Sequence, residues 1–148
     1  MISNNILLEL LNLGDGWEVR SIAYETKVRR LAIRVGETKK VWSKQVCPQP
    51  DCQRRTIVFK QYESSRSWRH LDLFGKRTDI LCAVPTGRCT RCDHAYRLPV
   101  PWEGEGKRYT REFEAFALKL MCEMPVEKAW ELIGESDPDQ WRMIFRRG

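Results

Sequence analysis

Six cysteines are the residues with the clearest chemistry in this chain, and four of them form two close pairs. Cys47 and Cys52 enclose the segment CPQPDC, and Cys89 and Cys92 enclose CTRC. A structural zinc site takes four thiolates or imidazoles at the corners of a tetrahedron. One turn can supply two ligands and a distant turn the other two, so the pattern predicts a structural Cys₄ zinc site. Such a closed site has no position for a substrate, which argues against hydrolysis at the metal.

The sequence alone also allows a second set of metal ligands, in which a histidine replaces one cysteine. The first pair is spaced more widely than the second, and His94 follows Cys92 by two positions, so His94 is an alternative ligand. His70 is isolated and is expected at the surface or as a polar strand residue. Cys82 and Cys122 lie among apolar residues and are expected in the core, as is common for free cysteines.

The bulk composition indicates a folded, globular protein. Of 148 residues, 42% are hydrophobic and 31% are charged, which is not the composition of a disordered chain. No run approaches the roughly 20 apolar residues of a membrane helix, and the start, MISNNILLELLNL, lacks the basic region of a signal peptide. We therefore expect no membrane partner and a reducing cytoplasm, where clustered cysteines bind metals.

The whole chain has a formal net charge of +6. Its positive charge is concentrated in one half of the sequence. Residues 20–97 contain 18 Lys or Arg and 7 Asp or Glu, whereas residues 107–148 contain 8 of each. A basic region of this kind favours phosphate through counterion release. A solvated basic face without a partner is the alternative.

The elements that would position the cysteines are mainly strands. Residues 17–35 alternate apolar and polar side chains, which predicts a β-hairpin that turns near residues 25–27. About three short strands are expected between the two cysteine pairs, with ESSRS as a turn. Residues 98–106 contain Pro and Gly and are expected to be a linker.

The last part of the chain has a helical period. Thr110 is the predicted N-cap of a first helix, Pro125 opens a second that Gly134 ends, and Asp137 caps a third. Three helices with short turns match the helix-turn-helix outline, whose last helix enters the major groove. A helical bundle without DNA contacts is the alternative.

The predicted fold class is therefore α+β, with an N-terminal β-hairpin and zinc ribbon followed by a small three-helix helix-turn-helix unit. The corresponding division is a zinc-ribbon domain at 1–97, a linker at 98–106 and a helix-turn-helix domain at 107–148.

This order of parts resembles the N-terminal region of bacterial insertion-sequence transposases of the ISL-three type. The segments WRHLDLFGKRTDILCAVPTGRCTRCDHAYRLPVP and KRYTREFEAFALKLMCEMPVEKAWELIG carry the resemblance, which extends from about residue 6 to 147. It places the four cysteines at zinc positions and Tyr109, Thr110 and Phe113 at the start of the first helix. It implies recognition of the inverted repeats at element ends. The family's DDE nuclease domain has no counterpart in this chain, so no enzymatic activity is expected.

The leading hypothesis is a zinc-dependent, double-stranded DNA-binding protein of transposase origin that recognises element ends or an operator-like site. It would act in the bacterial cytoplasm, bound to the nucleoid, with a second copy or a separate catalytic chain as further partner. Phosphate contacts would position it and base contacts from the third helix would specify the site. The expected DNA-contacting residues are Arg29, Arg30, Arg34, Lys39, Lys40, Arg54, Arg55, Gln140, Arg142, Arg146 and Arg147. A zinc-ribbon module for protein–protein interaction is the alternative.

Overall fold

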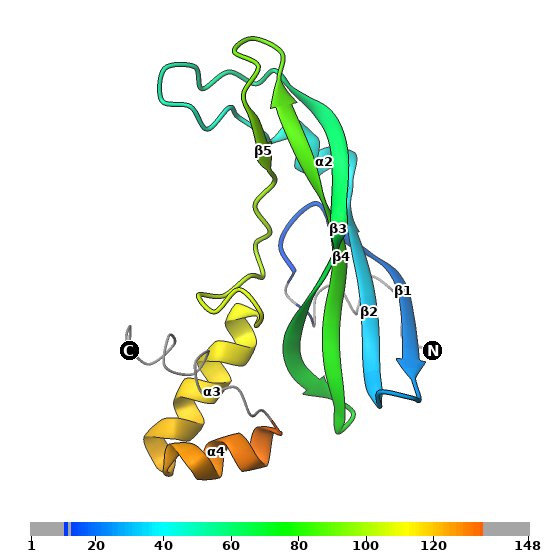
Figure 1. Cartoon of the computed structure of the whole chain (residues 1–148), viewed down its shortest axis with the longest axis vertical. Coiled ribbons are helices and arrows are strands. Elements are labelled where there is room, and N and C mark those ends of the chain that lie inside the picture. The colour runs from blue at the N-terminus through cyan, green and yellow to red at the C-terminus, as the bar shows by residue number, and fades with distance from the viewer. Residues whose placement is uncertain (1–10, 12, 135–148) are drawn as a thin grey trace.

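A long, twisted β-sheet runs along the whole molecule, with an irregular loop region at one end and two helices beside the other (Figure 1). The computed structural model describes residue 11 and residues 13–134 of the chain. The strands and helices within this range, in chain order, are β1 (Trp17–Glu25), β2 (Arg30–Glu37), α2 (Lys39–Ser43), β3 (Ile57–Leu73), β4 (Lys76–Cys89), β5 (Ala95–Arg97), α3 (Arg111–Glu123) and α4 (Val126–Ile133).

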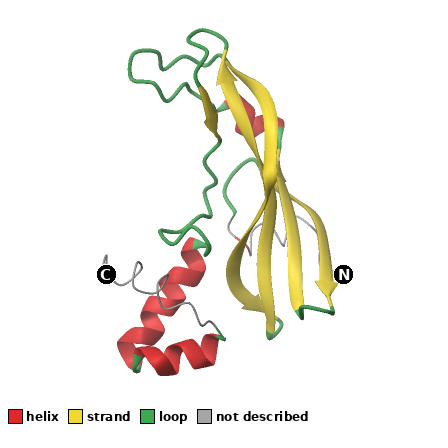
Figure 2. Cartoon of the chain, viewed as in Figure 1, coloured by secondary structure: helices red, strands yellow, loops and turns green. Residues whose placement is uncertain are grey.

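The five strands form one mixed sheet (Figure 2). Its order is β1-β2-β4-β3, and β5 pairs with the far end of β4. The pairing of β2 with β4 is parallel and ends at Arg34 opposite Leu81, whereas the other pairs are antiparallel. The first half of β4 therefore lies between β2 and β3, and its second half lies between β3 and β5.

The predicted fold class is wrong. The hairpin of β1 and β2 is not a separate unit, because β2 continues the sheet onto β4. Two long strands, β3 and β4, replace the short strands expected between the cysteine pairs, and register shifts between Tyr62 and Ser65 let the ESSRS segment continue as strand. Bulges of this kind absorb residues that do not fit a regular ladder.

The described range contains three short helices, α2, α3 and α4, and they do not form a helix-turn-helix unit after the ribbon. The helix α2 precedes the cysteines and was not expected. The predicted third helix after Asp137 lies outside the described residues. None of the helices within the described range is long and apolar enough to cross a membrane.

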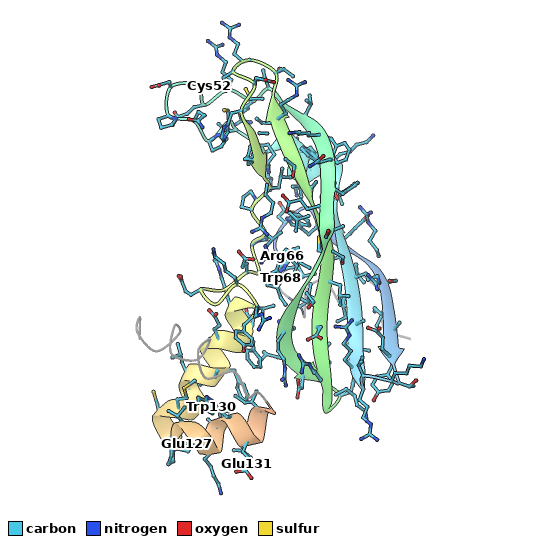
Figure 3. The ribbon with its side chains drawn as sticks, in the orientation of Figure 1. Cys52, Arg66, Trp68, Glu127, Trp130 and Glu131 are labelled. Atoms are coloured by element: carbon cyan, nitrogen blue, oxygen red, sulfur yellow. The ribbon has the colours of Figure 1, made fainter. Side chains whose placement is uncertain are left out.

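The main core lies on one face of the sheet, in the half that is lower in Figure 1 and that we call the lower sheet. Ile33, Ile80 and Trp68 stand in one row across β2, β4 and β3 and are fully buried. Trp102 packs edge-on against Trp68 with ring centroids 5.5 Å apart, and Leu98 belongs to the same cluster. Residues 98–106, expected as a linker, thus supply core side chains. Figure 3 labels Trp68 in mid-sheet beside Arg66.

The helices α3 and α4 form a second, smaller cluster beside β3. Thr110 caps α3 as predicted, since its Oγ1 accepts a hydrogen bond from the Phe113 backbone at 3.2 Å. Gly134 ends α4 in the left-handed conformation with φ 80°. Arg69 of β3 attaches the pair to the sheet, because its Nη2 donates to the Ile133 carbonyl at 2.8 Å.

Candidate metal centre and basic tip

The four paired cysteines meet at the upper end of the sheet in Figure 1, where Figure 3 labels Cys52. Cys47 and Cys52 lie in the loop between α2 and β3, whereas Cys89 ends β4 and Cys92 lies in the turn toward β5. Their sulfur atoms all lie within 4.8 Å of one another. The predicted Cys₄ cluster is therefore confirmed as a group that could hold a metal ion.

The sulfur geometry fits a tetrahedral metal ion. Bonds of about 2.3 Å from zinc to sulfur give a tetrahedron with edges of roughly 3.8 Å. The Sγ atoms of Cys52 and Cys89 are 3.8 Å apart, and those of Cys47 and Cys92 are 3.5 Å apart. Each of these contacts joins one loop to the other, so a bound ion would fasten both loops together. Four sulfurs without a carboxylate suit zinc or an iron–sulfur centre rather than magnesium or calcium.

Both loops reverse direction directly after their second cysteine. Gln53 and Asp93 have φ values of 51° and 65°, which lie in the left-handed region. The Cys52 amide donates to the Gln49 carbonyl at 3.0 Å, and the Asp93 amide donates to the Cys89 carbonyl at 2.9 Å. These tight turns place the two sulfurs of each pair on the same side of their loop.

The sulfur environments differ in their hydrogen-bond donors. The Thr56 hydroxyl lies 3.2 Å from the Cys89 sulfur, and this hydrogen bond lowers the pKa of Cys89 to about 6. Burial raises the pKa of Cys47 to about 12. Because metal binding requires thiolates, it releases the proton of Cys47.

His94 lies beside the cluster and outside it. Its Nδ1 is 3.0 Å from the Gln49 Nε2, and its ring stacks on Tyr96 with centroids 6.2 Å apart. The four sulfur atoms complete a tetrahedral set without an imidazole. We therefore assign His94 to support of the first cysteine loop through Gln49.

The remaining cysteines and histidine lie away from the cluster. Cys82 is buried in the sheet as expected, and burial raises its pKa to about 12. His70 is a strand residue, as predicted, but it is buried, and its Nδ1 lies 2.7 Å from the Thr110 hydroxyl. Cys122 is exposed on α3, so its expected place in the core is wrong.

The loops around the cluster form what we call the basic tip, residues 44–60 and 86–97. It contains seven Lys or Arg and two Asp. Four thiolates on one divalent ion would add two negative charges, which leaves a net charge of about +3. Arg88 pairs with Asp93 at 2.9 Å. Four exposed cations of the basic tip, which lies wholly within the described residues, have no ion-pair partner: Arg54, Arg55, Lys60 and Arg91.

Two of the predicted phosphate-contacting residues, Arg54 and Arg55, belong to the basic tip. Lys39 and Lys40 lie on α2, next to the upper sheet in Figure 1. Lys40 is engaged with Asp15 at 2.8 Å. The structure therefore brings part of the predicted set near the metal site.

The other predicted phosphate contacts lie away from the tip. Arg29 and Arg30 lie at the turn from β1 to β2, at the opposite end of the sheet (Figure 1). Arg30 is paired with Glu25 at 2.7 Å and with Asp79 at 3.0 Å. Arg34 is exposed on β2. The predicted base-reading residues lie outside the described residues: Gln140, Arg142, Arg146 and Arg147.

Sequence reasoning missed an aromatic group beside the basic tip. Phe59 and Tyr62 are 49% and 53% exposed, and their ring centroids are 4.8 Å apart. Trp42 of α2 meets Phe59 edge-on at 6.0 Å. A regular strand would place residues three apart on opposite faces. The register shift between Phe59 and Gln61 brings both rings to one face, and no sequence pattern announces that bulge.

Comparison of the chain with known protein families, with curated proteins and with solved structures gave no match. The resemblance to insertion-sequence transposases therefore stays an expectation from the sequence. The features of the chain that bear on its function are the cysteine cluster and the side chains around it.

Proposed function

We propose that this chain is a zinc-dependent, double-stranded DNA-binding protein whose DNA-contacting surface is the basic tip. The observation that carries the proposal is the group of four exposed cations without ion-pair partners beside the Cys₄ cluster: Arg54, Arg55, Lys60 and Arg91. Unpaired cations gain most from phosphate, because no internal ion pair has to be broken and bound counterions are released.

The shape of the upper sheet suits a duplex. Between Leu81, where β2 ends its pairing, and Thr86, where β5 begins its own, β3 and β4 form a two-stranded ribbon, and the three-residue strand β5 joins it only at the tip. The major groove is about 12 Å wide and admits a two-stranded β-ribbon. A ribbon that ends in a metal-fastened, basic tip can approach a groove with cations on its leading edge.

Zinc has a structural part in this proposal. The four cysteines would hold the ion, and the ion would supply the fixed junction between the loop that bears Arg54 and Arg55 and the turn that bears Arg91. Zinc has no redox chemistry and accepts a tetrahedral thiolate set. The resemblance to transposase N-terminal regions suggests element ends as the natural duplex.

The salt dependence of binding gives the test its scale. If the four free cations each neutralise one phosphate, log K falls with log salt with a slope of about −3.6, since each phosphate contributes about −0.9. Raising salt from about 50 to about 200 mM then weakens binding roughly 150-fold.

Fluorescence anisotropy with a blunt DNA duplex tests the proposal. The double variant Arg54→Ala/Arg55→Ala should reduce the slope by about 1.8, or about 0.9 for each lost cation. The matched control Arg29→Ala, at the far end of the sheet, should leave the slope unchanged. Chelation of the metal should abolish binding. No binding at about 50 mM salt, or an equal effect of the control, would refute the proposal.

A protein-interaction module is the second candidate, favoured by one apolar hollow. It has a volume of about 460 Å³ and lies between the helix pair and β3. Phe116 and Leu132 line it and are 44% and 65% exposed. Leu132→Lys separates the candidates, because it should impair docking of a protein partner and leave duplex binding intact.

A further inference from the structure

Two aromatic rings lie half exposed on β3, on the strand that leaves the basic tip. The strand β3 begins at Ile57, directly after the loop of the first cysteine pair. Phe59 stands opposite Gly87 of β4. The Trp42 ring of α2 meets Phe59 edge-on, with ring centroids 6.0 Å apart, and supports it from the side.

The second ring is fixed by a buried carboxylate. Glu37 is 7% exposed, and one of its oxygens accepts hydrogen bonds from the Tyr62 hydroxyl at 3.1 Å and from the Trp42 Nε1 at 3.3 Å. The orientation of both rings is thus set before any ligand arrives. Side chains that are already ordered lose little conformational entropy on binding, which favours affinity.

Two exposed cations lie close to the rings in the chain. Lys60 lies between Phe59 and Tyr62 in the chain, at the bulge, and it is exposed. Arg55 lies two residues before β3. Glu63 follows Tyr62 in the chain, and its exposed carboxylate accepts a hydrogen bond from the Thr86 hydroxyl at 3.4 Å. Exposed aromatic rings beside cations are the features that bind unpaired nucleotides, whose bases stack while their phosphates pair with the cations.

We infer that Phe59 and Tyr62 are a stacking platform for an unpaired base, so that the preferred ligand is a DNA duplex with a single-stranded extension. The inference rests on the proposed function, because the basic tip supplies the duplex contacts. A base inside a duplex is stacked on both faces, so only an unpaired base can reach the rings. A protein segment that covers the rings is the competing occupant, and it predicts no effect of an extension.

The experiment compares a blunt duplex with the same duplex that carries a short single-stranded extension. Stacking of a base on an aromatic ring is typically worth a factor of about 5 to 150 in affinity. We expect the extended duplex to bind at least about 5-fold more tightly. A 2-aminopurine in the extension should lose fluorescence on binding, which reports stacking in the wild-type protein without any substitution.

Three variants locate the effect. Phe59→Ala should abolish the preference for the extended duplex, so that the extended and the blunt duplex bind with equal affinity. Phe59→Tyr keeps a ring and should retain the preference. Val58→Ala is the matched control, because Val58 is 41% exposed on the same strand and its side chain points to the opposite face. Zinc content and circular dichroism check that each variant is folded.

The outcomes separate this inference from the proposed function. Equal affinity for the two duplexes, or unchanged 2-aminopurine fluorescence, overturns the stacking platform and leaves the duplex-binding proposal standing. The same loss of preference in Val58→Ala and Phe59→Ala also overturns it. Absence of binding to both duplexes overturns the two proposals together.

Discussion

Removal of the metal should unfold the basic tip and leave the sheet core folded. Between residues 44 and 56 and between residues 88 and 96, the buried hydrophobic side chains are those of Cys47 and Cys89 alone. Ordering the backbone costs roughly 1–2 kcal/mol per residue, and without the ion little apolar burial offsets that cost in the tip. The lower sheet has its own cluster around Trp68 and Ile80. We therefore expect two separate stability units.

Amide hydrogen exchange read by mass spectrometry measures both units. Three tip amides are informative, because their hydrogen bonds close the metal loops: Cys89 to the His94 carbonyl at 2.9 Å, Thr90 to the Thr56 carbonyl at 2.8 Å, and Asp93 to the Cys89 carbonyl at 2.9 Å. At free zinc near 100 times the dissociation constant, binding adds about 2.7 kcal/mol, so these amides should exchange about 100-fold more slowly than in the chelated protein.

The chelated protein and Cys89→Ser give the decisive comparison. In both, tip amides should exchange without protection, while amides around Ile33 and Ile80 stay protected. Cys122→Ser, which removes an exposed thiol outside the cluster, should behave as wild type. If chelation exposes the sheet amides as fully as those of the tip, the two parts are one cooperative unit. If chelation leaves the tip amides protected, the metal does not order the tip. Either result refutes the reasoning.

Further predictions concern single side chains, each measured by urea unfolding. Gln53→Gly should raise the free energy of unfolding by about 0.5–1 kcal/mol, because it relieves a left-handed residue while loosening the unfolded chain. Gly87→Ala should lower it by about 1–3 kcal/mol, since the new Cβ would lie 2.7 Å from the Ile57 Cγ2. Trp102→Ala should lower it by about 3–5 kcal/mol, as it empties the core between two other tryptophans. Burial lowers the pKa of His70 below its ordinary 6.5, so the unfolded chain takes up a proton that the folded chain refuses. Stability should therefore fall as pH drops below 6.5, and His70→Gln should flatten that dependence.

Local chemistry explains which features could be predicted from the sequence. The spacing of the cysteine pairs is enough to predict a metal site. Thr110 as the cap of α3 and Gly134 as the end of α4 are also predictable, because both depend on backbone hydrogen bonds within a few residues. Cys122 was expected in the core because its sequence neighbours are apolar, but the turn of the helix decides which side it faces. It follows Phe113 by nine residues, which at 3.6 residues per turn is the opposite face of the helix.

Long-range pairing explains what could not be predicted. The parallel ladder between β2 and β4 joins Ile33 to Ile80 across a long stretch of chain, and nothing in either segment states the register. The segment 98–106 has linker composition, yet α3 holds part of it. The Glu114 carboxylate accepts hydrogen bonds from the Glu105 and Gly106 amides at 2.8 and 2.6 Å. Tertiary contacts of this kind decide whether a Gly- and Pro-rich stretch is a linker or part of the core.

The bulges of β3 connect the fold to the proposed function. As the last strand of its sheet, β3 has no strand beside its outer edge along the upper half of the molecule among the described residues, and a flat free edge invites pairing with other chains. The shift between Phe59 and Gln61 interrupts that edge and twists it, which disfavours such pairing. The same extra residue lets Phe59 and Tyr62, which are three residues apart, lie on one face, with exposed Lys60 between them in the chain. Deletion of Lys60 therefore tests the role of the bulge at the strand edge and at the two rings together. It should restore a regular ladder in which the two rings are two residues apart and stay on one face, keep the preference for an unpaired base and increase self-association at the edge. A deletion variant that stays monomeric would show that the bulge does not protect the edge, and one that loses the preference would show that the rings need the bulge.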